Sequence, residues 1–121
     1  MKIIVVDDDV IMLQAIKTML AKNGYKVFAT TDAQDALDTI MEEDFDLIIS
    51  DIMMPYLSGI ELLSAIKRVN PALPIIIISA LDQQEVILTA FKEGAADFVK
   101  KPINLNELLL RVRKLLPINN E

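Results

Sequence analysis

Short apolar segments rich in isoleucine and valine recur along the chain, and a segment with helical periodicity follows each of them. These apolar segments show little alternation of polar and apolar residues, which is typical of parallel strands that are covered on both faces. Repetition of this strand–helix unit predicts β–α–β crossovers and an α/β fold, a three-layer α/β/α sandwich. The predicted strands are residues 2–6, 26–29, 47–50, 75–79 and 97–99.

The segments between these strands carry apolar residues at helical spacing, with intervals of three and four residues. Two patterns are strong, and weaker ones predict helices at 10–21, 60–69 and 85–92. The strong patterns consist of Ala33, Ala36, Leu37, Ile40 and Met41, and of Leu105, Leu108, Leu109, Val112, Leu115 and Leu116.

Residues that cap helices mark the ends of the predicted segments. Gly24 and Gly94 are typical of helix C-termini, because glycine readily adopts the left-handed conformation found there. Asp9, Asp82 and Asn104 are predicted N-caps, and the last two are followed three residues later by a glutamate.

The length of 121 residues fits one domain, which we place at residues 1–116, followed by a tail or linker stub at 117–121. The chain has no cysteine and no histidine, which excludes disulfides, the usual zinc sites and histidine-based catalysis. A net charge of −6 argues against direct binding of nucleic acid. We expect a cytoplasmic location, since no apolar stretch is long enough to span a membrane and the N-terminus does not resemble a signal peptide.

Polar side chains follow the predicted strands at the point where each strand ends. Asp7 and Asp8 follow the first strand, Asp51 follows the third, Ser79 ends the fourth, and Lys101 follows the fifth. Because ligands bind beyond the carboxyl ends of parallel strands, we expect these side chains to share one site.

Carboxylates a few ångströms apart repel one another unless a cation lies between them. Oxygen ligands favour a hard cation, and Mg²⁺ fits best. A lysine at the same edge would face the anion that the metal also binds, which equips Asp51 to attack phosphorus and form an aspartyl phosphate. Other roles remain open, because a buried serine can bond only to backbone and Lys100 or Lys101 could be a solvated edge lysine.

The sequence closely resembles the receiver domain of two-component response regulators, including the stand-alone CheY-like type. The resemblance rests on the ordered segments IIVVDDD, DLIISDIMMPYLSGIELL, PIIIISA and GAADFVKKP, and it covers essentially the whole chain. It implies a flavodoxin-like parallel sheet with the strand order 2-1-3-4-5 and five helices.

The resemblance also implies roles for individual residues. Asp51 matches the phosphoacceptor, and Asp7 and Asp8 match the acidic pair that binds Mg²⁺. The third protein ligand of the metal would be the main-chain carbonyl of Met53, and Lys101 matches the lysine that pairs with a phosphoryl oxygen.

Two further positions match the switch of this family. Ser79 corresponds to the residue that hydrogen-bonds the phosphoryl group, and Phe98 corresponds to the aromatic residue that moves inward. The sequence has Met53 and Leu81 where relatives with short-lived phosphates often carry polar groups that orient water. These apolar residues predict a long-lived phosphoryl group.

The implied function is that of a signalling switch, which catalyses only its own phosphorylation and dephosphorylation. Its donor would be a sensor histidine kinase or a histidine phosphotransfer protein. The face formed by the fourth helix, the fifth strand and the fifth helix would engage a downstream protein or a covalently linked output domain. No contact with nucleic acid or membrane is expected, and the domain would be a monomer or a phosphorylation-dependent dimer.

Two alternatives stay open at this point. A haloacid-dehalogenase-type phosphotransferase also uses an aspartyl phosphate, but it needs a second aspartate where this chain has Met53. A docking scaffold with a receiver fold would act without phosphorylation, and such domains usually lack an acid or the lysine that this chain retains.

Overall fold

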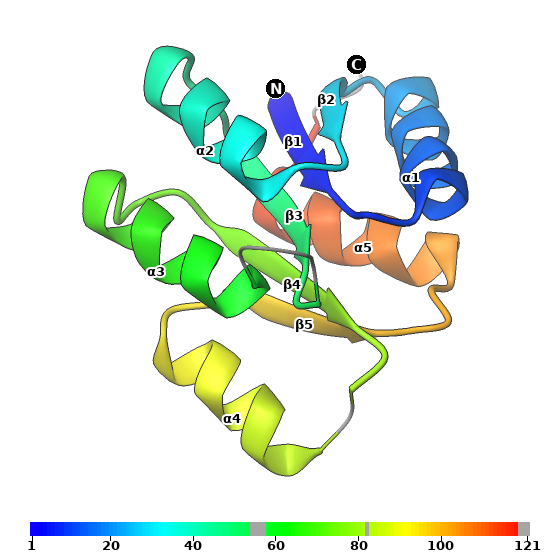
Figure 1. Ribbon diagram of the computed structural model, residues 1–121. Helices are drawn as coiled ribbons and strands as arrows, with labels where there is room; N and C mark the ends of the chain where they lie inside the picture. Colours follow the sequence, from blue (N-terminus) through cyan, green and yellow to red (C-terminus); the bar gives the residue numbers. More distant parts are fainter. Residues whose placement is uncertain (54–57, 82, 119–121) are drawn as a thin grey trace.

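The computed structural model of the protein describes residues 1–53, 58–81 and 83–118. Its centre is a parallel sheet with the order β2-β1-β3-β4-β5, as predicted from the resemblance (Figure 1). The strands are β1 (Lys2–Val6), β2 (Lys26–Thr30), β3 (Leu47–Asp51), β4 (Ile75–Ser79) and β5 (Asp97–Lys100).

Helices cover both faces of this sheet, so the predicted α/β/α sandwich is confirmed. One face packs against α1 and α5, and the other packs against α2, α3 and α4 (Figure 1). Every residue of β3 and β4 is buried, which explains their continuous apolar sequence. The helices are α1 (Val10–Lys22), α2 (Ala33–Glu42), α3 (Gly59–Val69), α4 (Gln84–Lys92) and α5 (Leu105–Leu115).

Three of the strands extend one residue further than the sequence predicts, to Thr30, Asp51 and Lys100. The main-chain pairing continues through these polar positions. Thr30 pairs with Val6 of β1, Asp51 pairs with Ile78 of β4, and Lys100 pairs with Ser79 of β4. The parallel register therefore brings the polar ends of the strands to one edge of the sheet.

The capping predictions hold wherever the structure describes the residue. Asp9 and Asn104 accept hydrogen bonds from the first turns of α1 and α5, and Gly24 and Gly94 have φ angles of 94° and 108°. The prediction for Asp82 lies outside the described residues. The observed N-cap of α4 is the next residue in the chain, and it makes no side-chain capping bond.

The end of α5 is tied to the start of β2 by one buried hydrogen bond. The Tyr25 hydroxyl donates to the main-chain oxygen of Leu116 over 2.8 Å. Leu116 is itself buried, and Ile118 packs beside it. The boundary of the domain at residue 116 stays a prediction, and residues 119–121 of the predicted tail lie outside the described part of the chain.

None of the helices in the described ranges is long and apolar enough to cross a membrane.

We expect Tyr25→Phe to lower the free energy of unfolding by about 1–2 kcal/mol, because it keeps the buried ring and leaves the Leu116 carbonyl without its donor. Urea unfolding of the two proteins measures this difference. An unchanged midpoint and slope would contradict a stabilising role for the bond.

Candidate functional site

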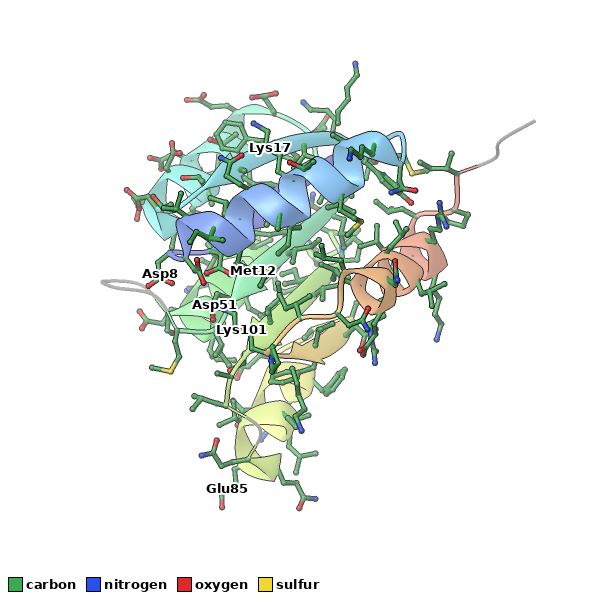
Figure 2. All side chains as sticks on the ribbon, turned by 90° about the vertical axis from the view of Figure 1, so that its right-hand side faces the viewer. Asp8, Met12, Lys17, Asp51, Glu85 and Lys101 are labelled. Atoms are coloured by element: carbon green, nitrogen blue, oxygen red, sulfur yellow. The ribbon has the colours of Figure 1, made fainter. Side chains whose placement is uncertain are left out.

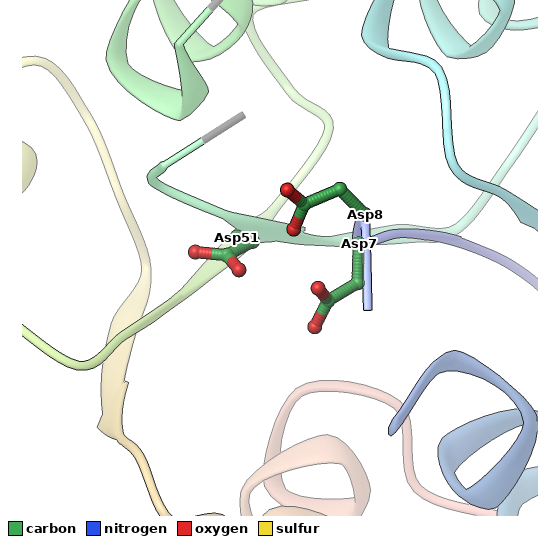
Figure 3. Close-up of side chains that lie close together, drawn as sticks. All are labelled: Asp7, Asp8 and Asp51. Carbon is green, nitrogen blue, oxygen red and sulfur yellow. The ribbon is translucent and has the colours of Figure 1, made fainter. Parts of the chain in front are cut away.

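Three carboxylates meet at the carboxyl edge of the sheet (Figure 3). Asp7 and Asp8 follow β1, and Asp51 is the last residue of β3. One carboxylate oxygen from each lies within 4.8 Å of the others. Asp7 and Asp51 are buried, whereas Asp8 is exposed at the rim, so the cluster could hold a metal ion that remains open to solvent.

Lys101 reaches the same cluster from the end of β5 (Figure 2). Its Nζ atom donates to Asp51 Oδ2 over 2.7 Å and lies 3.4 Å from Asp7 Oδ2. Its main-chain nitrogen donates to the oxygen of Ser79 over 2.8 Å, which fixes the lysine beside β4. The following Lys101–Pro102 peptide bond is cis.

The carboxyl of Asp7 has a raised pKa. Burial raises its pKa to about 6, with a further contribution from the negative charge of Asp51, while the main-chain N–H of Asp9 and the charge of Lys101 act in the opposite direction. Its Oδ1 accepts from that N–H over 2.9 Å.

The second oxygen of Asp7, Oδ2, is buried and has no hydrogen-bond partner among the described residues. A buried anionic oxygen without a donor is unfavourable, and a bound cation would remove this penalty. The donor set consists of carboxylate oxygens only, so it fits a hard cation.

The ammonium group of Lys101 also has a shifted pKa. Burial by itself lowers this pKa, but the hydrogen bond and the charge of Asp51, together with Asp7, outweigh burial and raise it. The lysine therefore stays cationic at neutral pH and supplies a fixed positive charge beside the Asp51 carboxylate.

Met53 contacts Asp51 through a hydrogen bond, whereas Ser79 bonds to the main chain that follows it. The buried Ser79 Oγ accepts from the Leu81 N–H over 2.9 Å, and the Met53 N–H donates to Asp51 Oδ1 over 3.0 Å. The side chains of Met53 and Leu81 line a groove of about 410 Å³ between the start of α3 and α4. Met53 is 58% exposed, and its main chain is bonded to the buried Asp51.

Phe98 lies away from the carboxylates, on the face of the sheet that α4 covers. It is buried in the cluster that also contains Ala90, with Val86 and Ile87 packed against this cluster. The structure thus places Phe98 in the buried cluster between the sheet and α4.

Lys100 and Lys101 both stand at the end of the last strand, and the resemblance assigns the role in the site to Lys101. Lys101 points into the carboxylate cluster, whereas Lys100, the last residue of β5, is exposed. The sequence analysis did not identify two ion pairs of Arg111. Its Nη1 atom lies 2.7 Å from Asp97 Oδ1, and its Nη2 atom lies 3.0 Å from Glu107 Oε1. The four-residue spacing of Glu107 and Arg111 was a signal for the second of these contacts.

Comparison with known proteins gives one consistent result. The profile of the response regulator receiver domain family matches residues 3–113. Response regulator MprA of Mycolicibacterium vanbaalenii is 36% identical over 115 residues, which are 95% of this chain and 50% of the relative. The transcriptional regulatory protein ZraR of Escherichia coli K12 is 35% identical over 114 residues, 94% of this chain and 26% of the relative.

Solved structures agree with these sequence relatives. The receiver domain of the Francisella response regulator 1452 has 40% identity and a TM-score of 0.89, with 94% of both chains covered. The BeF3-activated DrrB receiver domain has 36% identity and a TM-score of 0.89, with 97% of both chains covered. The chain spans about half the length of MprA and about a quarter of ZraR.

The burial of Asp7 makes a prediction about stability in the absence of metal. Its raised pKa means that the folded state binds the proton more tightly than the unfolded state, so stability falls as pH rises from about 3.8 to about 6 and stays low above that range. Asp7→Asn removes this effect. We expect it to raise the free energy of unfolding by about 2–3 kcal/mol at pH 7.5 and by clearly less at pH 4.5.

Urea unfolding in EDTA at both pH values measures this difference, and Asp44→Asn, at an exposed acid just after the C-terminus of α2, serves as the control. An equal gain at both pH values would show that the buried charge is not its cause.

Proposed function

Because the chain belongs to the response regulator receiver domain family, we propose that it is a phosphoacceptor switch that takes a phosphoryl group on Asp51 in the presence of Mg²⁺. Phosphorylation on aspartate and use of Mg²⁺ are general to this family. The observation that carries the proposal is the placement of the Asp51 carboxylate, which Lys101 contacts from one side and the acidic pair from another. Family membership sets aside the phosphotransferase alternative.

Asp7, Asp8 and Asp51 would hold the metal through their carboxylates, with the main-chain carbonyl of Met53 as a further ligand. When bound, Mg²⁺ neutralises the charge that three acids and a phosphoryl group bring together. The Oδ2 atom of Asp7 supports this assignment, since it is buried and accepts no hydrogen bond among the described residues, with the Lys101 ammonium 3.4 Å away.

The transfer itself needs a nucleophile and a positive charge in fixed positions. Asp51 donates an electron pair from one carboxylate oxygen to phosphorus, and the P–N bond to the histidine of the donor breaks as the new O–P bond forms. The electrons of the broken bond stay on the histidine nitrogen. Lys101 is within 2.7 Å of Asp51 Oδ2 and would move its hydrogen bond to a phosphoryl oxygen.

Ser79 and Phe98 would convert this event into a change of surface. Ser79 Oγ now accepts from the Leu81 N–H, and a phosphoryl oxygen would offer its hydroxyl proton a strong acceptor. Movement of Ser79 would leave room for Phe98, and α4 would follow. The phosphoryl group thus favours one of two states of the domain by its better contacts in that state.

The position of α4 is weakly determined, which supports its part in this switch. Only Ala90 of this helix is fully buried, and its N-cap makes no side-chain hydrogen bond. Leu88 and Phe91 of α4 are exposed, as is Leu110 of α5. We propose that α4, β5 and α5 form the face that binds a downstream protein or a linked output domain.

A sensor histidine kinase or a histidine phosphotransfer protein is the proposed donor, and the proposed location is the cytoplasm. The response regulators MprA and ZraR are longer than this chain, which supports an output domain as one of the possible partners. A monomer, or a dimer formed after phosphorylation, fits this role. In this role the domain would catalyse only its own phosphorylation and dephosphorylation.

Incubation with radiolabelled acetyl phosphate and Mg²⁺ tests the phosphoacceptor directly. We expect label on the wild-type protein and on Asp44→Asn, whereas Asp51→Asn or an excess of EDTA should abolish it, because the nucleophile or the metal is then missing. Label retained by Asp51→Asn would refute the assignment. A wild-type protein that takes no label would instead favour the docking scaffold.

The apolar side chains of Met53 and Leu81 should keep water from the aspartyl phosphate, because neither can orient an attacking molecule. We expect Met53→Asn to shorten the lifetime of the phosphoryl group several-fold, as measured by loss of label after removal of the donor. Met41→Asn changes a similarly exposed methionine on α2 and should leave the lifetime unchanged. Equal lifetimes for all three proteins would count against this role of Met53.

A further inference from the structure

The start of α3 packs directly against the end of β3, next to the residues that form the site. Gly59 is the first residue of α3, and its N–H donates to the main-chain oxygen of Ile52 over 2.9 Å. A Cβ atom at Gly59 would lie 2.4 Å from the main-chain oxygen of Asp51 and 2.5 Å from Ile52 Cα. Both are backbone atoms, so no rotation of a side chain could relieve the overlap. The absence of a side chain at Gly59 therefore determines how closely α3 approaches β3.

The same oxygen of Asp51 has a second buried contact. The Ser50 hydroxyl, which is 1% exposed, donates to the Asp51 main-chain oxygen over 3.0 Å. This bond is not part of the sheet ladder, because it runs from a side chain to the carbonyl of the next residue. The Ser50 hydroxyl bonds to the main-chain oxygen of Asp51, and Gly59 packs against the same peptide group. Neither contact involves the carboxylates.

That peptide group is rigidly connected to the reacting groups. The Ile52 N–H donates to the main-chain oxygen of Ile78 over 2.9 Å, and the Met53 N–H donates to Asp51 Oδ1 over 3.0 Å. A shift of the Asp51 carbonyl would therefore move the carboxylate and the main chain of Met53 together. Both groups belong to the proposed metal and phosphoryl site.

We propose that Ser50 and Gly59 are positioning residues, which hold the Asp51 peptide so that the carboxylate and the Met53 carbonyl meet the metal in the correct geometry. This inference rests on the proposed function. A displacement of about 1 Å near a reacting group can reduce a rate by roughly a hundredfold. A Cβ atom at Gly59 would require the Asp51 peptide or α3 to shift by nearly this distance. Loss of the Ser50 hydroxyl would only remove one hydrogen bond that restrains the peptide.

Three variants test the proposal. Gly59→Ala introduces the overlap, Ser50→Ala removes the hydroxyl with almost no change in volume, and Ser64→Ala is the matched control. Ser64 lies on α3, and its hydroxyl donates to Glu93 Oε2 over 3.3 Å, away from the carboxylates. For each protein we would measure the Mg²⁺ dissociation constant by calorimetry, the rate of labelling by acetyl phosphate at saturating Mg²⁺, and urea unfolding in EDTA.

We expect Gly59→Ala to lower the labelling rate by roughly tenfold to a hundredfold and to weaken Mg²⁺ binding. Ser50→Ala should reduce the labelling rate and the Mg²⁺ affinity several-fold, and Ser64→Ala should change neither the rate nor the affinity. If Gly59→Ala does not fold, Ser50→Ala carries the test. Wild-type Mg²⁺ affinity and labelling in Ser50→Ala and in any folded Gly59→Ala would overturn the proposal, whatever the change in stability.

Failure of the proposed function gives a different result. In that case the wild-type protein takes no label, but Mg²⁺ affinity still reports on the geometry of the carboxylates. Weaker Mg²⁺ binding by Ser50→Ala and Gly59→Ala than by Ser64→Ala would then still support positioning, and equal binding would overturn it.

Discussion

Asp7 and Asp51 are two buried carboxylates that repel each other at the edge of the sheet, and the ammonium group of Lys101 lies within ion-pair distance of both. The lysine compensates only part of the repulsion, since Asp7 Oδ2 lacks a hydrogen bond and the pKa of its carboxyl is raised by burial. The site is thus destabilising without a further cation. A bound metal would relieve this repulsion, and a phosphoryl group would offer Lys101 a new partner. The unfavourable energy of the cluster would thus contribute to the affinity for both proposed ligands.

The parallel sheet makes this arrangement possible. The middle positions of its strands are mostly apolar and buried, and charged groups occupy or follow several of their carboxyl ends, so these groups collect at one edge of the sheet. The helices differ in how firmly they are anchored. Four of them bury two to four residues each, whereas α4 buries only Ala90, in the same cluster as Phe98. The element proposed to move is the one with the fewest buried anchors, as expected for a switch.

At this edge, the residues proposed to react are distinct from the residues proposed to position them. Asp51 and Lys101 face each other, while Ser50 and Gly59 act on the peptide behind Asp51. Sequence analysis recognised the first pair because charged residues after buried strands are unusual. It had no signal for the second pair, because serine in a strand and glycine at a helix start are common for many reasons.

Local chemistry alone determined the order of strands and helices, their limits to within about a residue, and most of their caps, because periodicity and capping depend on neighbours in the chain. The residue types at the strand ends, together with the family resemblance, were enough to assemble the candidate site. Only the tertiary structure decided how Lys101 divides its contacts between Asp51 and Asp7, that Asp7 is buried while Asp8 is exposed, and that α3 leaves no space for a side chain at Gly59. These features depend on strand register and on contacts between segments far apart in sequence, which no local pattern encodes.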